Sequence, residues 1–148
     1  MNDINDQRSS TGEPQKNVAL LLYLAIVAGA VLGVVALTII GARGVMSPSP
    51  DLPLLPIRVV GLVLLVFGFL AVGILSGGIP PLGTGADESE WWSANSTRAV
   101  GTWAMAEGLA ILGAVFWVLT GDTILYVGLV AGGFVLLFLN RPQRMMKG

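Results

Sequence analysis

The stretch AVGTWAMAEGLAILGAVFWVLT, from Ala99 to Thr120, decides the fold of this chain. Its 22 residues are enough to cross a bilayer as one α-helix. It contains Glu107, the only charged residue in the interior of any long apolar run. A carboxyl group at membrane depth is costly, and it usually has a function or a partner. We therefore interpret the other apolar runs as membrane-spanning helices arranged around this one.

The composition is that of a membrane protein. The chain has 148 residues, of which 54% are hydrophobic and 11% are charged, whereas soluble domains carry roughly 25% charged residues. The net charge of −1 gives no basic surface for nucleic acid. Cys and His are both absent, which removes disulfides, thiol catalysis and the usual zinc and haem ligands. We predict no catalytic residues, no metal site, no cofactor and no enzyme activity.

Four apolar runs predict an all-α integral membrane protein whose helices run up, down, up and down through the lipid bilayer. The predicted spans are residues 18–40, 57–78, 99–120 and 123–139, and together they form one membrane domain, 17–140. Low hydrophobicity predicts a disordered polar tail over residues 1–16. Residues 141–148 form a short basic tail.

Two long connectors join the spans. Residues 44–56 contain four prolines and cannot be helical. In the second connector, 82–97, we predict a short surface helix over 87–94, whose adjacent tryptophans are interfacial anchors. Asn95-Ser96-Thr97 matches a glycosylation acceptor, but we interpret it as a source of N-cap side chains for the third span.

Gly121 and Asp122 predict a tight turn between the third and fourth spans. Glycine suits the C-terminal cap of one helix, and aspartate suits the N-cap of the next. The two spans are therefore expected to form an antiparallel hairpin.

The basic residues predict the orientation. Six bases fall on one side of the bundle and two on the other: Arg8, Lys16, Arg98, Arg141, Arg144 and Lys147 against Arg43 and Arg58. The positive-inside rule then places both termini in the cytoplasm, which predicts a multi-pass protein of the bacterial inner (cytoplasmic) membrane. Arg58, in the first turn of its span, and Arg98 are expected to extend to the lipid headgroups.

The depth of Glu107 limits its partners. It is eight residues beyond Ala99, so it lies roughly 12 Å deep at about 1.5 Å per residue, on the cytoplasmic side of the midplane. We expect the carboxyl to be protonated and hydrogen-bonded. The candidate partners are Tyr23, Ser76 or a group on another protein, so these residues form the predicted ion-binding site or buried hydrogen-bond node.

Small residues recur at helical spacing in the spans. Such residues let helix backbones approach one another closely, either within the chain or between copies. The predicted packing positions are Gly29, Gly33, Gly73, Gly77, Gly128 and Gly132.

The segment AMAEGLAILG, from Ala104 to Gly113, resembles the outer helix of the ring-forming c subunit of rotary ATP synthases. That helix carries an ion-binding carboxylate followed by small and aliphatic residues and a glycine. The resemblance implies that Glu107 binds and releases H⁺ or Na⁺. The whole chain is similar to small bacterial four-span inner-membrane proteins, without an assigned activity, that carry such a third helix. The likeness is carried by Arg98, Glu107, Gly121-Asp122 and Arg141-Pro142.

Three functions follow from these observations. The first is an accessory or structural membrane subunit, which binds other membrane proteins or itself through small-residue helix faces. The alternative is a proton- or Na⁺-carrying subunit in which Glu107 is the ion-binding carboxylate. The third is an enzyme or small-molecule site at the acidic connector residues Asp87, Glu88 and Glu90, although such a run is usually solvated surface.

Overall fold

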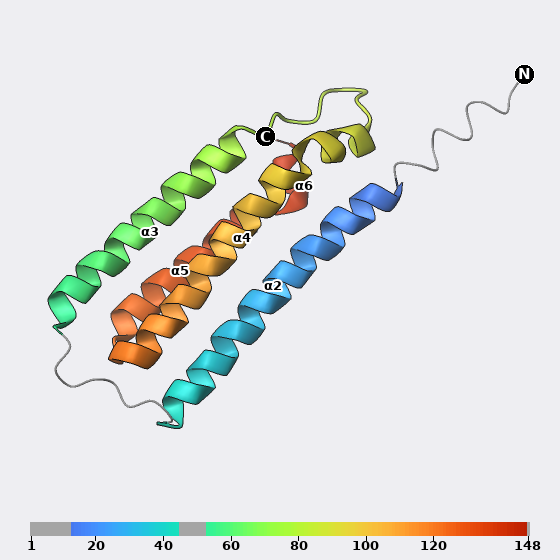
Figure 1. Ribbon diagram of the computed structural model, residues 1–148. Coiled ribbons are helices and arrows are strands. Elements are labelled where there is room, and N and C mark those ends of the chain that lie inside the picture. Colours follow the sequence, from blue (N-terminus) through green and yellow to red (C-terminus); the bar gives the residue numbers. More distant parts are fainter. Residues whose placement is uncertain (1–12, 45–52, 148) are drawn as a thin grey trace, which may run out of the picture.

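The computed structural model describes residues 13–44 and 53–147, and this part of the chain is all-helical (Figure 1). The helices are α2 Glu13–Ala42, α3 Leu54–Gly77, α4 Glu88–Thr120, α5 Thr123–Leu139 and the single turn α6 Pro142–Met145. The predicted all-helical architecture is confirmed for these residues.

Three of the helices, α2, α3 and α4, are long and apolar enough to cross a membrane. The candidate spans 16–42, 54–77 and 88–120 have 27, 24 and 33 residues, and about 20 apolar residues are needed to cross the hydrocarbon core. The fourth, α5, is apolar but has only 17 residues, which at about 1.5 Å per residue gives a length of roughly 25 Å.

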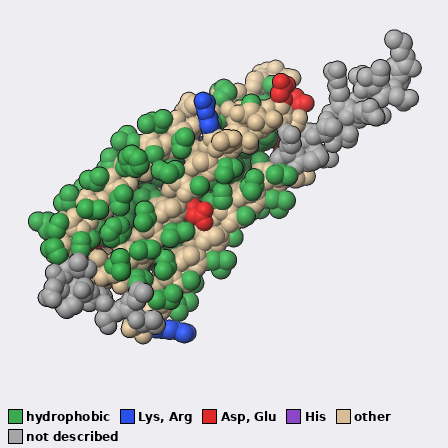
Figure 2. All heavy atoms as spheres, in the orientation of Figure 1, with side chains coloured by type: hydrophobic (Ala, Val, Ile, Leu, Met, Phe, Trp, Pro, Cys, Tyr) green, Lys and Arg blue, Asp and Glu red, His purple; other side chains and the backbone are tan. Residues whose placement is uncertain are grey.

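The outer surface of the bundle is apolar. Large hydrophobic side chains on α2 and α3 point away from the rest of the chain, with Leu32 68% and Ile74 76% exposed. Figure 2 shows that hydrophobic side chains cover most of one face, with charged groups near its ends and one acidic group midway along it. A contiguous apolar surface of this extent is not found on soluble monomers, so the surface fits a lipid environment.

The central helix is α4. It contacts α2, α3 and α5, and α5 also contacts α3 (Figure 1). Of the most apolar part of α4, 44% is buried, compared with 17% for α2 and for α3. The buried core is built around α4 by Trp103, Ala106, Leu109 and Ala110, with Leu129 and Leu137 from α5. The quoted stretch 99–120 is therefore the structural centre of the described chain.

The helix that contains this stretch begins eleven residues earlier than predicted. Its N-cap is Asp87, whose carboxylate accepts a hydrogen bond from the Ser89 N–H at 2.8 Å. The predicted N-cap role of Asn95-Ser96-Thr97 is wrong, because Asn95 lies inside α4 and its side-chain amide donates to the Trp91 carbonyl at 2.9 Å. The predicted surface helix over 87–94 is instead the first part of α4.

Other boundaries also differ from the prediction. α2 begins at Glu13, within the predicted tail 1–16, while residues 1–12 lie outside the described part. α3 begins at Leu54 rather than at residue 57, and its first turn includes Pro56, where the missing N–H of proline is not needed. Residues 45–52 of the first connector also lie outside the described part, and the predicted basic tail contains α6.

The predicted hairpin turn is confirmed. Gly121 has a left-handed backbone with φ of 69°, and Asp122 caps α5 by accepting hydrogen bonds from the N–H groups of Ile124 and Leu125. The lack of a Cβ makes this conformation inexpensive for glycine. The turn therefore folds α5 back against α4.

Candidate functional site

Glu107 lies on α4 and faces α2. A Cβ added to Gly29 would stand only 2.7 Å from the Glu107 Oε1, so the carboxyl rests directly on this glycine. Gly29 is the middle residue of the predicted span 18–40. The carboxyl therefore lies beside the middle of that predicted span, and its depth of roughly 12 Å on the cytoplasmic side of the midplane stays a prediction.

The predicted hydrogen bonds from Tyr23 and Ser76 to Glu107 are not formed. The Tyr23 hydroxyl donates to the Leu137 carbonyl of α5 at 3.1 Å, and its ring packs edge-on against Trp103. Leu137 is in the last turn of α5, where backbone carbonyls have no partner within the helix. The Ser76 hydroxyl donates to Gly73 in its own helix at 3.4 Å. Among the described residues, no hydrogen bond reaches the half-buried Glu107 carboxyl.

The face of α4 beside Glu107 is open. Ala104 and Met105 are exposed, and a Cβ added to Gly108 would meet no atom within 4 Å. Figure 1 shows α2 and α3 on either side of α4. Small side chains therefore border the Glu107 carboxyl on a helix surface that no described part of the chain covers.

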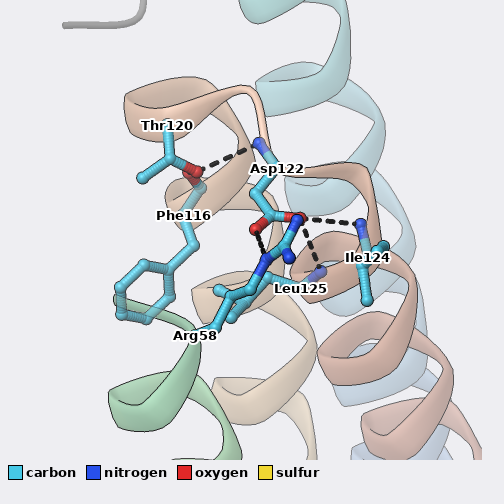
Figure 3. Close-up of polar contacts among 6 residues, drawn as sticks. All are labelled: Arg58, Phe116, Thr120, Asp122, Ile124 and Leu125. Atoms are coloured by element: carbon cyan, nitrogen blue, oxygen red, sulfur yellow. Dashed lines mark hydrogen bonds and ion pairs between the residues drawn. The ribbon is translucent and has the colours of Figure 1, made fainter. Parts of the chain in front are cut away.

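A second polar site joins Arg58 of α3 to Asp122 of the hairpin (Figure 3). The Arg58 Nε donates to the Asp122 Oδ2 at 2.6 Å. The other carboxylate oxygen, Oδ1, accepts from the Ile124 and Leu125 N–H groups at 3.0 and 3.3 Å. The Asp122 side chain is 1% exposed, whereas that of Arg58 is 47% exposed. One carboxylate thus both begins α5 and ties the hairpin to α3.

The surroundings of Asp122 favour its charged form. The hydrogen bond from Arg58, supported by the N–H groups of Leu125 and Ile124, holds the pKa of the Asp122 carboxyl below its usual value, although burial acts in the opposite direction. The sequence predicts that Arg58 extends to the headgroups and that Asp122 only caps a helix. The sequence contained one indication of this ion pair, because both residues belong to the same predicted side of the membrane.

The opposite end of the bundle is joined by side chains that donate to backbone carbonyls. Trp103 Nε1 donates to the Asn140 carbonyl at 2.7 Å, and Trp91 Nε1 donates to the Pro80 carbonyl at 2.8 Å. Arg98 is exposed and donates to the Gly78 carbonyl at the C-terminal end of α3, and its expected extension to the headgroups stays a prediction. These bonds fasten α4 to the ends of α5 and α3.

The predicted packing glycines fall into two groups. Gly29, Gly33 and Gly132 lie against side chains of neighbouring helices, whereas a Cβ added to Gly73, Gly77 or Gly128 would meet nothing within 4 Å. The second group therefore does not pack against another described helix. Approaches of similar closeness occur at five other glycines: Gly41, Gly61, Gly68, Gly113 and Gly133.

Gly133 makes the tightest contact with a backbone. A Cβ there would stand 2.6 Å from the Ala106 carbonyl oxygen and 2.7 Å from the Ala110 nitrogen. Spacing alone does not reveal this contact, because it depends on how α5 is rotated about its axis.

In the described part of the chain, no group of acidic residues is placed to hold a metal ion. A search of known protein families found no match to this chain, and neither did searches of curated proteins and solved structures. The fold and the site define the class of protein: a helical bundle with three candidate membrane-spanning helices, a shorter fourth, and one carboxyl group beside the middle of α2.

Proposed function

We propose that this chain is a small integral membrane protein that acts as an accessory or structural subunit and crosses the membrane four times. It binds a membrane-spanning helix of another subunit, or of a second copy, over the open face of α4. Glu107 is the hydrogen-bond node of that contact. The observation that carries the proposal is a carboxyl group beside the middle of α2 that has no hydrogen-bond partner among the described residues.

The physical basis is the cost of a polar group in lipid. A carboxyl group in the hydrocarbon requires a hydrogen-bond partner or a water-filled path. A second helix that approaches Ala104 and Gly108 closely can supply a donor or an acceptor to Glu107, because these small residues allow backbones to come near. The same contact covers the exposed surface of α4.

The proposed location is the bacterial inner membrane with both termini in the cytoplasm. Support comes from the basic end of the bundle. Lys16 pairs with Glu88 at 3.3 Å, and the Leu82 N–H donates to the Met146 carbonyl at 2.9 Å, so the start of α2, the second connector and the chain's C-terminal end lie together. Five of the six bases predicted to be cytoplasmic belong to the described residues at this end.

A second candidate function is proton or Na⁺ carriage by Glu107. The observation that favours it is the partial exposure of the carboxyl, which leaves it accessible from outside the chain. To carry a proton or Na⁺, the carboxyl must release and rebind that ion. The accessory role requires only that the carboxyl donate or accept a hydrogen bond.

Substitutions of Glu107 distinguish the two functions. The full chain is reconstituted, and folding, assembly state and ion flux are measured for Glu107→Gln, Glu107→Ala and the surface control Glu90→Gln. For an accessory subunit, we expect Gln to retain assembly, since an amide still hydrogen-bonds, and Ala to weaken it by about tenfold or more. For a carrier, Gln would fold and assemble normally but abolish flux.

Gly108→Leu tests the same face without altering the carboxyl. Its side chain enters open space, so the fold should tolerate it while a docked helix is excluded. Gly73→Leu is the matched control, because it too meets no neighbour but lies on α3. If folded Glu107→Ala and Gly108→Leu variants both assemble like the wild type, the accessory function is rejected.

A further inference from the structure

An apolar crevice opens between α3 and α5, with Arg58 at its mouth. Its volume is about 210 Å³, and its walls include Gly61, Leu65, Leu125 and Gly128. Arg58 is in the first turns of α3, and Leu65 is seven residues further along the helix. The crevice therefore begins near the helix ends and extends roughly 10 Å toward the middle of the bundle.

Glycine keeps this crevice open. A Cβ added to Gly128 would meet no atom within 4 Å, whereas one added to Gly61 would overlap Leu125. The Leu125 side chain thus packs directly on Gly61, and space is left beside Gly128. Its volume is too small for another helix, which has a diameter of about 10 Å, but its mainly apolar walls suit a hydrocarbon chain.

The guanidinium of Arg58 has donors to spare. Only its Nε binds Asp122, and among the described residues neither Nη group has a protein partner. The Asp122 carboxylate, in contrast, is buried and already accepts hydrogen bonds from three groups. An anion that approaches the mouth therefore meets the arginine donors rather than the aspartate.

We infer that this crevice binds an anionic phospholipid, with the phosphate on the Arg58 Nη groups and one acyl chain between α3 and α5. Arginine binds phosphate oxygens through two parallel N–H donors. The depth is appropriate, because Arg58 and Asp122 lie at helix ends, where headgroups begin. The positive charge at the mouth suits an anionic headgroup, and the apolar walls below it suit an acyl chain. A phospholipid carries both of these groups.

Headgroup chemistry decides the selectivity of such a site. The acyl chain gains little by leaving bulk lipid, which is as apolar as the leucines of the crevice. The arginine contact supplies the preference, so an anionic headgroup should bind more tightly than a zwitterionic one, whose positive charge opposes the guanidinium. A fatty acid has the acyl chain without the phosphate, and free phosphate has the anion without the chain. Each therefore tests one of the two contacts separately.

The test is native mass spectrometry of the full chain in a neutral detergent. Phosphatidylglycerol, phosphatidylcholine, oleate and inorganic phosphate are titrated in turn. We expect phosphatidylglycerol to bind about tenfold more tightly than phosphatidylcholine, as one charge-assisted contact requires. Inorganic phosphate should not displace it. Equal binding of oleate and phosphatidylglycerol, or displacement by phosphate alone, would overturn the assignment to a phospholipid.

Two variants place the bound lipid. Arg58→Gln removes the phosphate donors, and Gly128→Leu fills the crevice while leaving the Arg58–Asp122 ion pair intact. Each should weaken phosphatidylglycerol binding about tenfold, whereas the controls Arg43→Gln and Gly73→Leu should not. Thermal unfolding shows which variants are folded. If Arg58→Gln is unfolded, Gly128→Leu decides, and unchanged binding by this folded variant would refute the site.

Discussion

Asp122 shows how much of this fold depends on one side chain. Its carboxylate supplies the N-cap that α5 needs and the only acidic partner of Arg58 among the described residues (Figure 3). The first role fixes where α5 begins, and the second fixes the position of α3 relative to the hairpin. The two roles use different oxygens, Oδ1 and Oδ2, so they can be separated by substitution.

We predict that Asp122→Asn and Asp122→Ala destabilise the protein to different extents. Asparagine is as good an N-cap as aspartate, so only the bond to Arg58 is lost, and because the Asp122 side chain is buried the cost should be about 1–3 kcal/mol. Alanine removes the cap as well and should cost about 1–2 kcal/mol more. The free energy of unfolding of the detergent-solubilised chain measures both. Equal destabilisation by the two variants would contradict the separation of roles.

The same carboxylate should make the stability depend on pH. Because Arg58 lowers the pKa of Asp122 in the folded state, its stabilisation is present above the usual aspartate pKa, about 3.9, and is lost as the pH falls through the lower folded pKa. The temperature at the midpoint of thermal unfolding should therefore decrease when the pH is lowered below about 4. Asp122→Asn cannot titrate, so this acid-dependent loss should be smaller in the variant.

At the scale of elements, the contact between α4 and α5 is a backbone contact made at Gly133. The Ala106 carbonyl and the Ala110 nitrogen of α4 occupy the space where a Cβ would stand. Backbone atoms cannot rotate away as a flexible side chain can, so any larger residue must push the helices apart. Gly128, one and a half turns earlier on the same helix, has no such neighbour.

We predict that Gly133→Ala destabilises the bundle, whereas Gly128→Ala does not. Overpacking costs about 1–3 kcal/mol, and the helix propensity gained from alanine, about 1 kcal/mol in water, offsets part of it. Gly128→Ala gains the same propensity without overpacking, so Gly133→Ala should be less stable than Gly128→Ala by about 1–3 kcal/mol. Unfolding of both variants in the same detergent gives the comparison. Equal stability of the two variants would show that α4 and α5 are not this close.

The sequence predicted the elements better than their mutual arrangement. Apolar runs have a length that can be read directly, and Gly121-Asp122 marks a turn by local chemistry alone. The start of α4 was missed because residues 88–98 are polar on average, although Trp91 and Trp92 in this segment are buried. Local composition does not reveal that their surroundings include other helices.

The candidate site shows the same limit. Glu107 was identified because a single acid in an apolar run is conspicuous, but its neighbour is Gly29 rather than Tyr23. Which residues face each other depends on the rotation of each helix about its axis. Side-chain packing across all four helices sets that rotation. The Arg58–Asp122 pair was missed for this reason, even though both residues were placed on one side.

At the scale of the whole molecule, α5 is the shortest of the four apolar helices that we propose to cross the membrane. Its 17 residues are at the short end of what can span the hydrocarbon core. A short span can be accommodated by local thinning of the bilayer or by flanking residues that extend to the interface. Its two ends are both fixed against α4, one by the turn at Asp122 and the other by the bond from Trp103, near the middle of α4, to Asn140. These contacts favour a helix that crosses together with α4.

We predict that single cysteines will report four crossings. The chain contains no native cysteine, so Ala42→Cys, Thr84→Cys, Thr123→Cys and Gln143→Cys, all at exposed positions, can each be labelled alone. In sealed, oriented vesicles, a membrane-impermeant maleimide should reach positions 84 and 143 from one side and 42 and 123 from the other. The positive-inside rule assigns the first pair to the cytoplasm. Labelling of 123 and 143 from the same side would show that α5 does not cross, and reversal of both pairs would invert the orientation while leaving the bundle unchanged.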